Sequence, residues 1–322
     1  MQINNTCTLP RIDLHCHLDG SLTQSCVSEL LGRTVSPAEL QVADDCRDLA
    51  TYLEKFQLPL RCLQTKEGLY KAAETFLLSL QDDGVRYVEV RFAPLLSTHA
   101  NLSCRSVIEA VLEGLKSAHV HCGIHYNVIV CAMRHHTDEQ NIAMLRVARE
   151  YLGRGVCAAD LAGNEAAYPM EDFIDVFREA KRLDFPFTIH AGECGRVENI
   201  IEAIELGATR IGHGIAMQGK PQVQELVRRR HIGIEMCPIS NGQTKAVEDM
   251  RCYPLREFLT AGVPVTINTD NRTVSHTSLK TEFDFVRSQY HITEQEIRQM
   301  TNTAIEVAYA DDSVKHKLWL SC

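Results

Sequence analysis

Eight short hydrophobic segments, rich in β-branched residues, recur along the chain and predict eight buried β-strands. They cover residues 11–15, 85–92, 124–132, 155–161, 187–190, 209–212, 231–236 and 263–268. Amphipathic patterns of helical period separate most of them, for example over residues 70–80, 106–116, 170–182 and 196–206. Because parallel strands need a crossover connection, this alternation predicts a parallel sheet covered by helices.

Eight strand–helix units favour a (β/α)8 TIM barrel over an open, doubly wound sheet. The open-sheet alternative would place a glycine-rich phosphate-binding turn after the first strand, and the chain carries the sequence HCHLDG there instead. Residues 22–65 are too many for a simple strand–helix connection and contain their own helical pattern. We therefore expect a helical insertion over the barrel mouth, within a single domain that spans residues 1–322.

The composition is that of a soluble globular protein, because 45% of the 322 residues are hydrophobic and 23% are charged. The net charge of −9 argues against nucleic acid or an anionic membrane as a partner. The first residues lack a signal-peptide pattern, no stretch reaches 18 apolar residues, and we expect a cytoplasmic protein. The 13 cysteines include no Cys-x-x-Cys pair, so we expect reduced thiols rather than a zinc ribbon. The sequence gives no indication of the oligomeric state.

Polar side chains follow several predicted strands at the carboxyl end, where barrel enzymes build their active sites. His15 and His17 lie two residues apart, so a strand would point both imidazoles to the same side. Three further segments place a histidine or a carboxylate where a strand stops, namely HAGE (190–193), IGHG (211–214) and NTDN (268–271). Three imidazoles and one carboxylate form a zinc site that can activate water near neutral pH.

Taken in order, the motifs HxHLDGSL, DLAGNE, HAGE, IGHG, CPISN and NTDN resemble those of the adenosine deaminase family within the amidohydrolase superfamily. The resemblance extends from residue 9 to about residue 278. It implies hydrolytic deamination of adenosine and 2′-deoxyadenosine, a small purine nucleoside as the substrate, and one zinc ion per chain. It also implies that the metal ligands are His15, His17, His190 and Asp270.

The same resemblance implies roles for residues around the purine. Glu193 would donate a proton to N1, and His213 would orient or deprotonate the attacking water. The backbone N–H of Gly163 would contact N3, and Asp19 would bind a ribose hydroxyl. Members from animals carry a second aspartate where this chain has Asn271, whose amide can donate a hydrogen bond to N7 without first taking up a proton.

Residues 49–56 place apolar side chains at helical spacing, and the resemblance implies that they form a lid over the ribose and base. The lid would contact the substrate through Leu49, Tyr52 and Phe56. His17 would contribute to the substrate site as well as to the metal site. Plain core packing is the alternative explanation for an apolar stripe of this kind.

Several alternatives remain open from the sequence. Glu193 could instead cap the following helix, Asp19 could form an Asx-turn, and His213 could be a buried structural histidine. A deaminase of free adenine or of a modified adenosine is the alternative enzyme. A two-metal hydrolase usually carries a bridging lysine after the fourth strand, and no lysine occurs there. A barrel that only binds a ligand is the non-enzymatic alternative.

The remaining histidines lie outside the motifs. We expect them to be solvated or structural, because three flank the start of the third strand and two follow its end without further ligands nearby. These residues are His119, His121, His125, His135 and His136.

Overall fold

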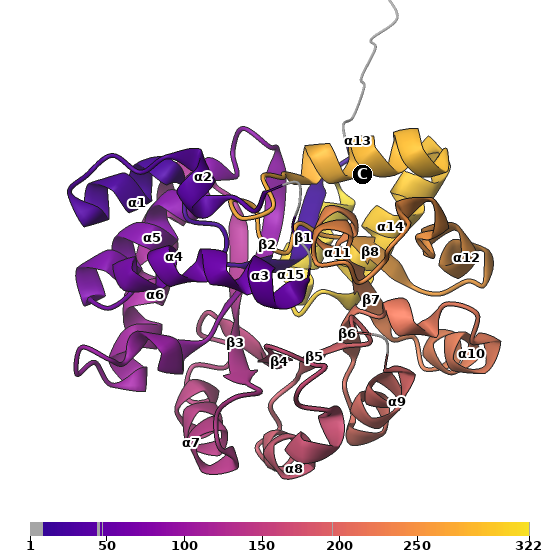
Figure 1. The fold of residues 1–322 in the computed structure, drawn as a ribbon, viewed down its shortest axis with the longest axis horizontal. Helices are drawn as coiled ribbons and strands as arrows, with labels where there is room; N and C mark the ends of the chain where they lie inside the picture. The colour runs from indigo at the N-terminus through magenta and orange to yellow at the C-terminus, as the bar shows by residue number, and fades with distance from the viewer. Residues whose placement is uncertain (1–8, 44–45, 47, 195, 322) are drawn as a thin grey trace, which may run out of the picture.

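The chain folds into alternating strands and helices in a computed structural model, which describes residues 9–43, 46, 48–194 and 196–321 (Figure 1). The strands are β1 (Arg11–His17), β2 (Val85–Phe92), β3 (His125–Met133), β4 (Val156–Ala162), β5 (Thr188–Ala191), β6 (Arg210–His213), β7 (Gly233–Met236) and β8 (Val265–Ile267). All neighbouring strands within each sheet pair in parallel.

Helices follow or cover these strands. The α-helices are α1 (Gln24–Leu31), α2 (Pro37–Leu40), α3 (Leu49–Leu53), α4 (Gln57–Cys62), α5 (Lys66–Ser79), α6 (Cys104–Cys122), α7 (Asp138–Arg149), α8 (Ile174–Arg182), α9 (Val197–Leu206), α10 (Pro221–Arg229), α11 (Pro238–Gln243), α12 (Leu255–Thr260), α13 (Leu279–Tyr290), α14 (Glu294–Val307) and α15 (Asp312–Trp319). Short 3₁₀ helices are η1 (Glu54–Phe56), η2 (Pro94–Ser97), η3 (Met170–Phe173), η4 (Ile215–Met217) and η5 (Met250–Cys252).

The strands form two four-stranded sheets, β1-β2-β3-β4 and β5-β6-β7-β8, and backbone contacts join the sheets at both seams. At one seam, His17 N–H donates to the carbonyl of Asp270 and Asp270 N–H donates to the carbonyl of His15, each at 2.7 Å. At the other seam, Ala159 N–H donates to the carbonyl of Pro186 at 2.8 Å. The eight strands therefore close into the predicted (β/α)8 barrel.

The predicted strands and the observed strands differ by two residues or fewer at each end. β7 begins at Gly233 rather than at His231, because His231 adopts a left-handed backbone conformation (φ 53°) after α10. Helix α6 is longer than predicted, since Ser103 caps its start and Gly123 ends it in the left-handed conformation. The first four residues of the predicted helix 170–182 form the 3₁₀ helix η3.

Between β1 and α5, the described residues of the insertion form the short helices α1 to α4 and η1, and α3 lies in front of the strands in the view of Figure 1. Helix α14 packs against β1 and β8, and an apolar cluster that includes Ile12, Leu14 and Ile305 joins it to β1. Barrel enzymes build their sites at the opposite, carboxyl end of the strands.

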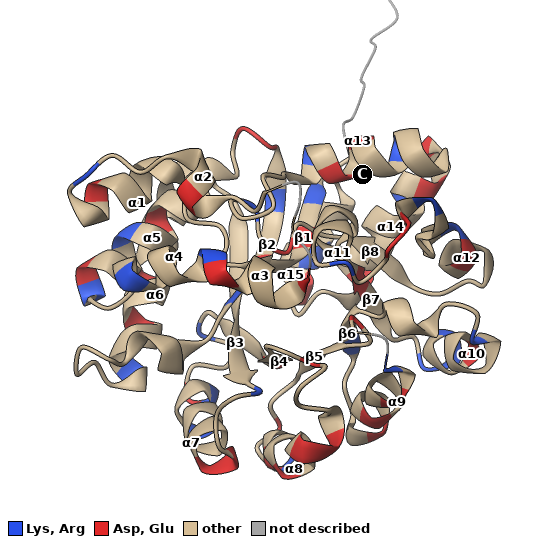
Figure 2. Cartoon of the chain, in the orientation of Figure 1, with Lys and Arg blue, Asp and Glu red and all other residues tan. Residues whose placement is uncertain are grey.

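In the view of Figure 2, the outer helices carry Lys and Arg interspersed with Asp and Glu. Among the described residues, no helix is long and apolar enough to cross a lipid bilayer. The eleven cysteines within the described residues are free thiols.

Candidate active site

A cavity of about 380 Å³ opens at the carboxyl ends of the strands, beneath the insertion. The insertion contributes apolar side chains, and the strand ends contribute most of the polar ones. Most predicted site residues line this cavity, namely His17, Asp19, Leu49, Tyr52, Phe56, Gly163, His190, Glu193, His213, Asp270 and Asn271. The remaining predicted residue, His15, is fully buried below them.

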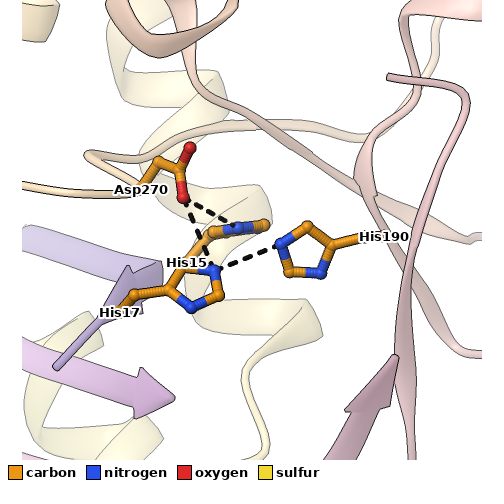
Figure 3. A group of neighbouring side chains, drawn as sticks. All are labelled: His15, His17, His190 and Asp270. Carbon is orange, nitrogen blue, oxygen red and sulfur yellow. Dashed lines mark hydrogen bonds and ion pairs between the residues drawn. The ribbon is translucent and has the colours of Figure 1, made fainter. Parts of the chain in front are cut away.

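Four side chains from three different parts of the barrel converge on one point, as Figure 3 shows for His15, His17, His190 and Asp270. His17 Nε2 lies 3.2 Å from His190 Nε2 and 3.5 Å from Asp270 Oδ1. His15 Nε2 also lies 3.5 Å from Asp270 Oδ1. The atoms of these four residues that could bind a metal all lie within 4.8 Å of one another. We call the four residues the metal group, because together they could hold a metal ion.

The opposite nitrogens of two of these imidazoles face buried carboxylates. His15 Nδ1 lies 2.8 Å from Glu235 Oε2, and His190 Nδ1 lies 2.8 Å from Asp160 Oδ2. An imidazole that donates Nδ1–H to a carboxylate keeps the lone pair of its Nε2 available for a metal. Arg91 contacts both carboxylates, at 2.8 Å from Glu235 and 2.9 Å from Asp160, and so links the two pairs.

The pKa shifts of His17 and Asp270 also fit a cation. Burial, with the neighbouring histidines, holds the pKa of His17 well below its usual range. Burial alone would raise the pKa of Asp270, but the adjacent imidazoles of His15 and His17 outweigh burial and lower it. His15 Nε2 is buried and has no hydrogen-bond partner. An imidazole with a lowered pKa, an ionised carboxylate and an unpartnered nitrogen belong to a donor set that suits a divalent cation.

A second group of possible ligands, His213, Cys237 and Asp270, shares Asp270 with the first. Burial and the nearby carboxylates raise the pKa of the Cys237 thiol well above its usual range. Because a thiol must lose its proton to bind a metal, this second group is the poorer site.

Glu193 lies beside the metal group, on the turn that follows β5. Its carboxyl is buried, and Oε1 accepts a hydrogen bond from the Thr244 hydroxyl at 3.3 Å. The turn itself is held by Glu165, which accepts from the backbone N–H groups of Gly192, Glu193 and Cys194 at 2.7, 2.9 and 3.1 Å. The alternative role of Glu193 as a helix cap is wrong, because Arg196 occupies the N-cap of α9.

His213 ends β6 with a left-handed backbone (φ 66°), a conformation that non-glycine residues rarely adopt. Its Nε2 lies 3.8 Å from Glu193 Oε2, and its Nδ1 lies 3.0 Å from Asn241 Nδ2. Asp270 has a similar conformation (φ 58°) after β8. Strained residues of this kind concentrate at functional sites, where the surrounding structure enforces them.

Two buried oxygen atoms in the cavity have no hydrogen-bond partner, Asp19 Oδ1 and Asn271 Oδ1. Burial raises the pKa of Asp19 to about 7. Asn271 lies against Gly20, where a Cβ atom would be 1.9 Å from Asn271 Oδ1, so a larger residue at position 20 would displace the Asn271 side chain. Gly163 follows β4 with φ 110°, a conformation that favours glycine, and exposes its backbone to the cavity.

The insertion covers the cavity through α3 and η1. Tyr52 is buried, and its hydroxyl lies 2.6 Å from the Ser275 hydroxyl, which ties α3 to the segment after β8. Tyr52 also packs in a small apolar cluster with Leu49 and Phe56. These side chains therefore line the cavity and also pack against one another.

His135 has an exposed side chain, in agreement with the expected solvated role, and it lies at the wall of the cavity. It follows β3 at the carboxyl end of the barrel and faces the space under the insertion, which the sequence does not reveal. At the other end of β3, His119 Nδ1 contacts the carbonyl of Ile124 at 2.8 Å, in agreement with a structural role.

The sequence analysis assigned no role to several buried polar residues that contact the site residues or their backbone. Asp160 and Glu165 belong to the motif DLAGNE, and Ser240 and Asn241 belong to CPISN, so both motifs carried a signal without an assigned role. Glu235 lies inside β7, where a carboxylate between isoleucine and methionine is unusual for a buried strand.

Comparisons with known proteins agree with this geometry. A family model described as adenosine deaminase matches residues 10–321. The chain is 40% identical to an adenosine deaminase of Enterococcus faecalis, with 96% of this chain and 95% of that protein covered. It is 38% identical to an adenosine deaminase of Clostridium acetobutylicum, with 96% of both chains covered.

Solved structures share the fold. An adenine deaminase from Arthrobacter aurescens superposes with a TM-score of 0.87 at 21% identity, with 97% of this chain and 98% of that chain covered. The N6-methyl-AMP deaminase of Arabidopsis thaliana gives 0.85 at 26% identity, with coverages of 98% and 96%. The family match over nearly the whole chain, and the relatives at about 40% identity, show that this protein belongs to the adenosine deaminase family.

Proposed function

We propose that this protein catalyses the hydrolytic deamination of adenosine and 2′-deoxyadenosine, with one zinc ion per chain. The observation that carries the proposal is the convergence of three imidazoles and the Asp270 carboxylate beside Glu193 in one cavity. Zinc bound by His15, His17, His190 and Asp270 would lower the pKa of water and so supply a strong nucleophile near neutral pH.

Glu193 acts on the purine ring. C6 of adenine is a poor electrophile because attack there disrupts the aromatic ring, and a proton on N1 lowers this barrier. In its protonated form Glu193 donates that proton. The water oxygen then bonds to C6, the bond from C6 to the amino nitrogen breaks, and ammonia leaves. The proton from Glu193 stays on N1, one water proton leaves on ammonia, and the other water proton returns to Glu193.

The other polar groups orient the nucleoside. The unpartnered Asp19 Oδ1 accepts a hydrogen bond from a ribose hydroxyl, the Gly163 N–H contacts N3, and the Asn271 amide contacts N7. Leu49, Tyr52 and Phe56 cover the ribose and base and exclude water from the reacting atoms. His213 directs the attacking oxygen toward C6.

The cavity favours a nucleoside over a nucleotide. Its described lining contains three carboxylates, Asp19, Glu193 and Asp270, and no lysine or arginine. A 5′-phosphate would therefore find no lysine or arginine side chain in this lining to pair with. Deamination of free adenine or of a modified adenosine remains the second candidate, since one structural neighbour is an adenine deaminase and another acts on N6-methyl-AMP.

The experiment that tests the proposal is an assay of ammonia release from adenosine, 2′-deoxyadenosine, adenine, AMP and N6-methyladenosine, run side by side with a zinc determination. We expect the highest kcat/KM for the two unmodified nucleosides and one zinc ion per chain. A preference for adenine, AMP or N6-methyladenosine would contradict the proposed substrate, and two metal ions per chain would contradict the single-zinc site.

A further inference from the structure

One short segment after β7 contacts three of the residues to which the proposed function gives roles. The Ser240 hydroxyl donates to Asp270 Oδ2 at 2.5 Å, and Thr244 donates to Glu193 Oε1 at 3.3 Å. Between them, Asn241 Nδ2 lies 3.0 Å from His213 Nδ1. Helix α11 and the residue after it therefore touch His213, Glu193 and Asp270 from one side, and the function proposed above uses none of these contacts.

The contact of Asn241 has a defined direction. The Tyr253 hydroxyl donates to Asn241 Oδ1 at 3.0 Å, so the amide oxygen is occupied and the NH₂ group faces His213. The backbone holds the residue in place, since Asn241 N–H donates to the carbonyl of Cys237 at 2.9 Å. Asn241, Tyr253 and His213 are all buried, so water does not compete for these groups.

An amide NH₂ can only donate, so His213 Nδ1 must accept, and a ring nitrogen that accepts carries no proton. The neutral ring then carries its single proton on Nε2. That nitrogen faces the cavity and lies 3.8 Å from Glu193 Oε2. His213 thus presents an N–H group to the reacting atoms, not a lone pair.

We propose that Asn241, anchored by Tyr253, is a positioning residue that holds His213 as the Nε2–H tautomer, so that His213 donates a hydrogen bond to the attacking oxygen and does not accept its proton. This inference rests on the proposed function and decides between the two roles, orienting or deprotonating, open to His213. The water proton then goes to a carboxylate. Glu193 is ionised after it has protonated N1, so its carboxylate can accept this proton.

The direct test is the ¹⁵N spectrum of zinc-loaded protein labelled at histidine, with the His213 signals assigned by their loss in His213→Gln. We expect an unprotonated Nδ1 and a protonated Nε2. Asn241→Asp replaces the donor by an acceptor, and we expect the proton to move to Nδ1. A wild-type His213 protonated on Nδ1 would overturn the inference, as would an Asn241→Asp spectrum identical to that of the wild type.

Kinetics give a second readout. If the tautomer matters, Asn241→Asp should lower kcat for adenosine by about 10²–10⁴-fold with KM changed less than about threefold, the scale of a misplaced acid–base group. A rise in KM with kcat unchanged would contradict the inference. Asn127→Leu is the matched control, because Asn127 also pairs with a tyrosine hydroxyl, Tyr87 at 3.0 Å, at the other end of the barrel. It should alter neither the His213 signals nor kcat.

Tyr253→Phe keeps the inference falsifiable if Asn241→Asp does not fold. Without the Tyr253 hydroxyl, the Asn241 amide can rotate by 180° and present its oxygen to His213, so we expect a population of His213 with Nδ1 protonated. An unchanged spectrum would show that Tyr253 does not anchor the Asn241 amide. The spectrum does not depend on turnover. A protein that fails to release ammonia from adenosine would refute the proposed function alone, whereas an active protein protonated on Nδ1 would refute only this inference.

Discussion

Asp160 Oδ2 lies 2.8 Å from His190 Nδ1, and both side chains are buried behind the cavity. The same oxygen accepts a hydrogen bond from Arg91 at 2.9 Å. The charges of His190 and Arg91 outweigh the effect of burial and keep the pKa of Asp160 well below its usual range. Asp160 therefore stays ionised and fixes both the orientation of the His190 ring and the nitrogen that faces the metal group.

Asp160→Asn should weaken zinc binding by about 10–100-fold, the usual loss when a carboxylate behind a metal-binding histidine is removed. An amide NH₂ in place of Oδ2 would point a donor at two other donors, His190 Nδ1–H and the Arg91 guanidinium. Competition with a chelator of known affinity measures the loss. Asp83→Asn is the control, because Asp83 is a buried carboxylate that pairs with Arg272 at 2.8 Å outside the metal group. Equal zinc affinity in Asp160→Asn and the wild type would contradict the prediction.

Glu193→Gln should lower kcat for adenosine by about 10²–10⁴-fold while zinc content and nucleoside affinity stay close to those of the wild type. Glutamine can keep the hydrogen bond from Thr244 but cannot protonate N1. Steady-state kinetics, a zinc determination and equilibrium binding of inosine separate these effects. If Glu193→Gln deaminated adenosine at the wild-type rate, Glu193 would not be the proton donor.

The sequence predicts the barrel and the converging residues because both follow from local patterns. A hydrophobic run marks each buried strand, and a polar residue directly after a strand lies at the carboxyl end of the barrel, so His190, His213 and Asp270 are brought to one rim. The barrel topology alone is enough to bring the side chains of the metal group together. Strand positions are therefore within two residues of those predicted, and His15 and His17 lie beside Asp270 as expected.

The contacts behind the site could not be predicted in this way, because they join side chains far apart in the sequence. Arg91 pairs with Glu235 across 144 positions of the chain, and Asn241 meets His213 through a short helix. A buried arginine or glutamate within a strand indicates that a partner of opposite charge exists but does not identify it.

Gly20→Ala should raise KM for adenosine by about 5- to 12-fold without loss of zinc. A Cβ at position 20 would lie 1.9 Å from Asn271 Oδ1 and 2.6 Å from Asn271 Cγ, so the side chain that contacts N7 in the proposed complex must move. Such a displacement removes a hydrogen bond to the substrate, and a buried hydrogen bond is worth about 1–1.5 kcal/mol. Steady-state kinetics and a zinc determination test this, and unchanged KM would show that Asn271 does not contact the base.

Removal of the metal should abolish deamination and lower the thermal midpoint, because a ligand that binds only the folded state stabilises it. The four residues at the metal group would then place an ionised carboxylate and three imidazoles together without a cation. We expect zinc, added back to chelator-treated protein, to restore both activity and the midpoint. Asp270→Ala should lose this response, and a zinc-dependent rise of wild-type size in that variant would remove Asp270 from the ligand set.

Glu282 should make the protein less stable as pH rises. Its carboxyl is fully buried, it accepts hydrogen bonds from Ile239 N–H and the Thr277 hydroxyl, and burial raises its pKa well above the usual range. Below pH about 4.3, the ordinary pKa of glutamic acid, both the folded and the unfolded states hold the proton. Above that pH the unfolded chain releases its proton while the folded state keeps it, so the free energy of unfolding falls until the folded pKa is reached.

Glu282→Gln removes this titration and keeps the side-chain volume. Urea unfolding of metal-free wild type and variant, measured at intervals from about pH 5 to pH 8, should show the variant gaining stability relative to the wild type as pH increases. Each pKa unit by which the folded state exceeds the unfolded state contributes about 1.4 kcal/mol to the difference. Two curves that stay parallel over the whole range would mean that the Glu282 carboxyl ionises equally easily in the folded and unfolded chains.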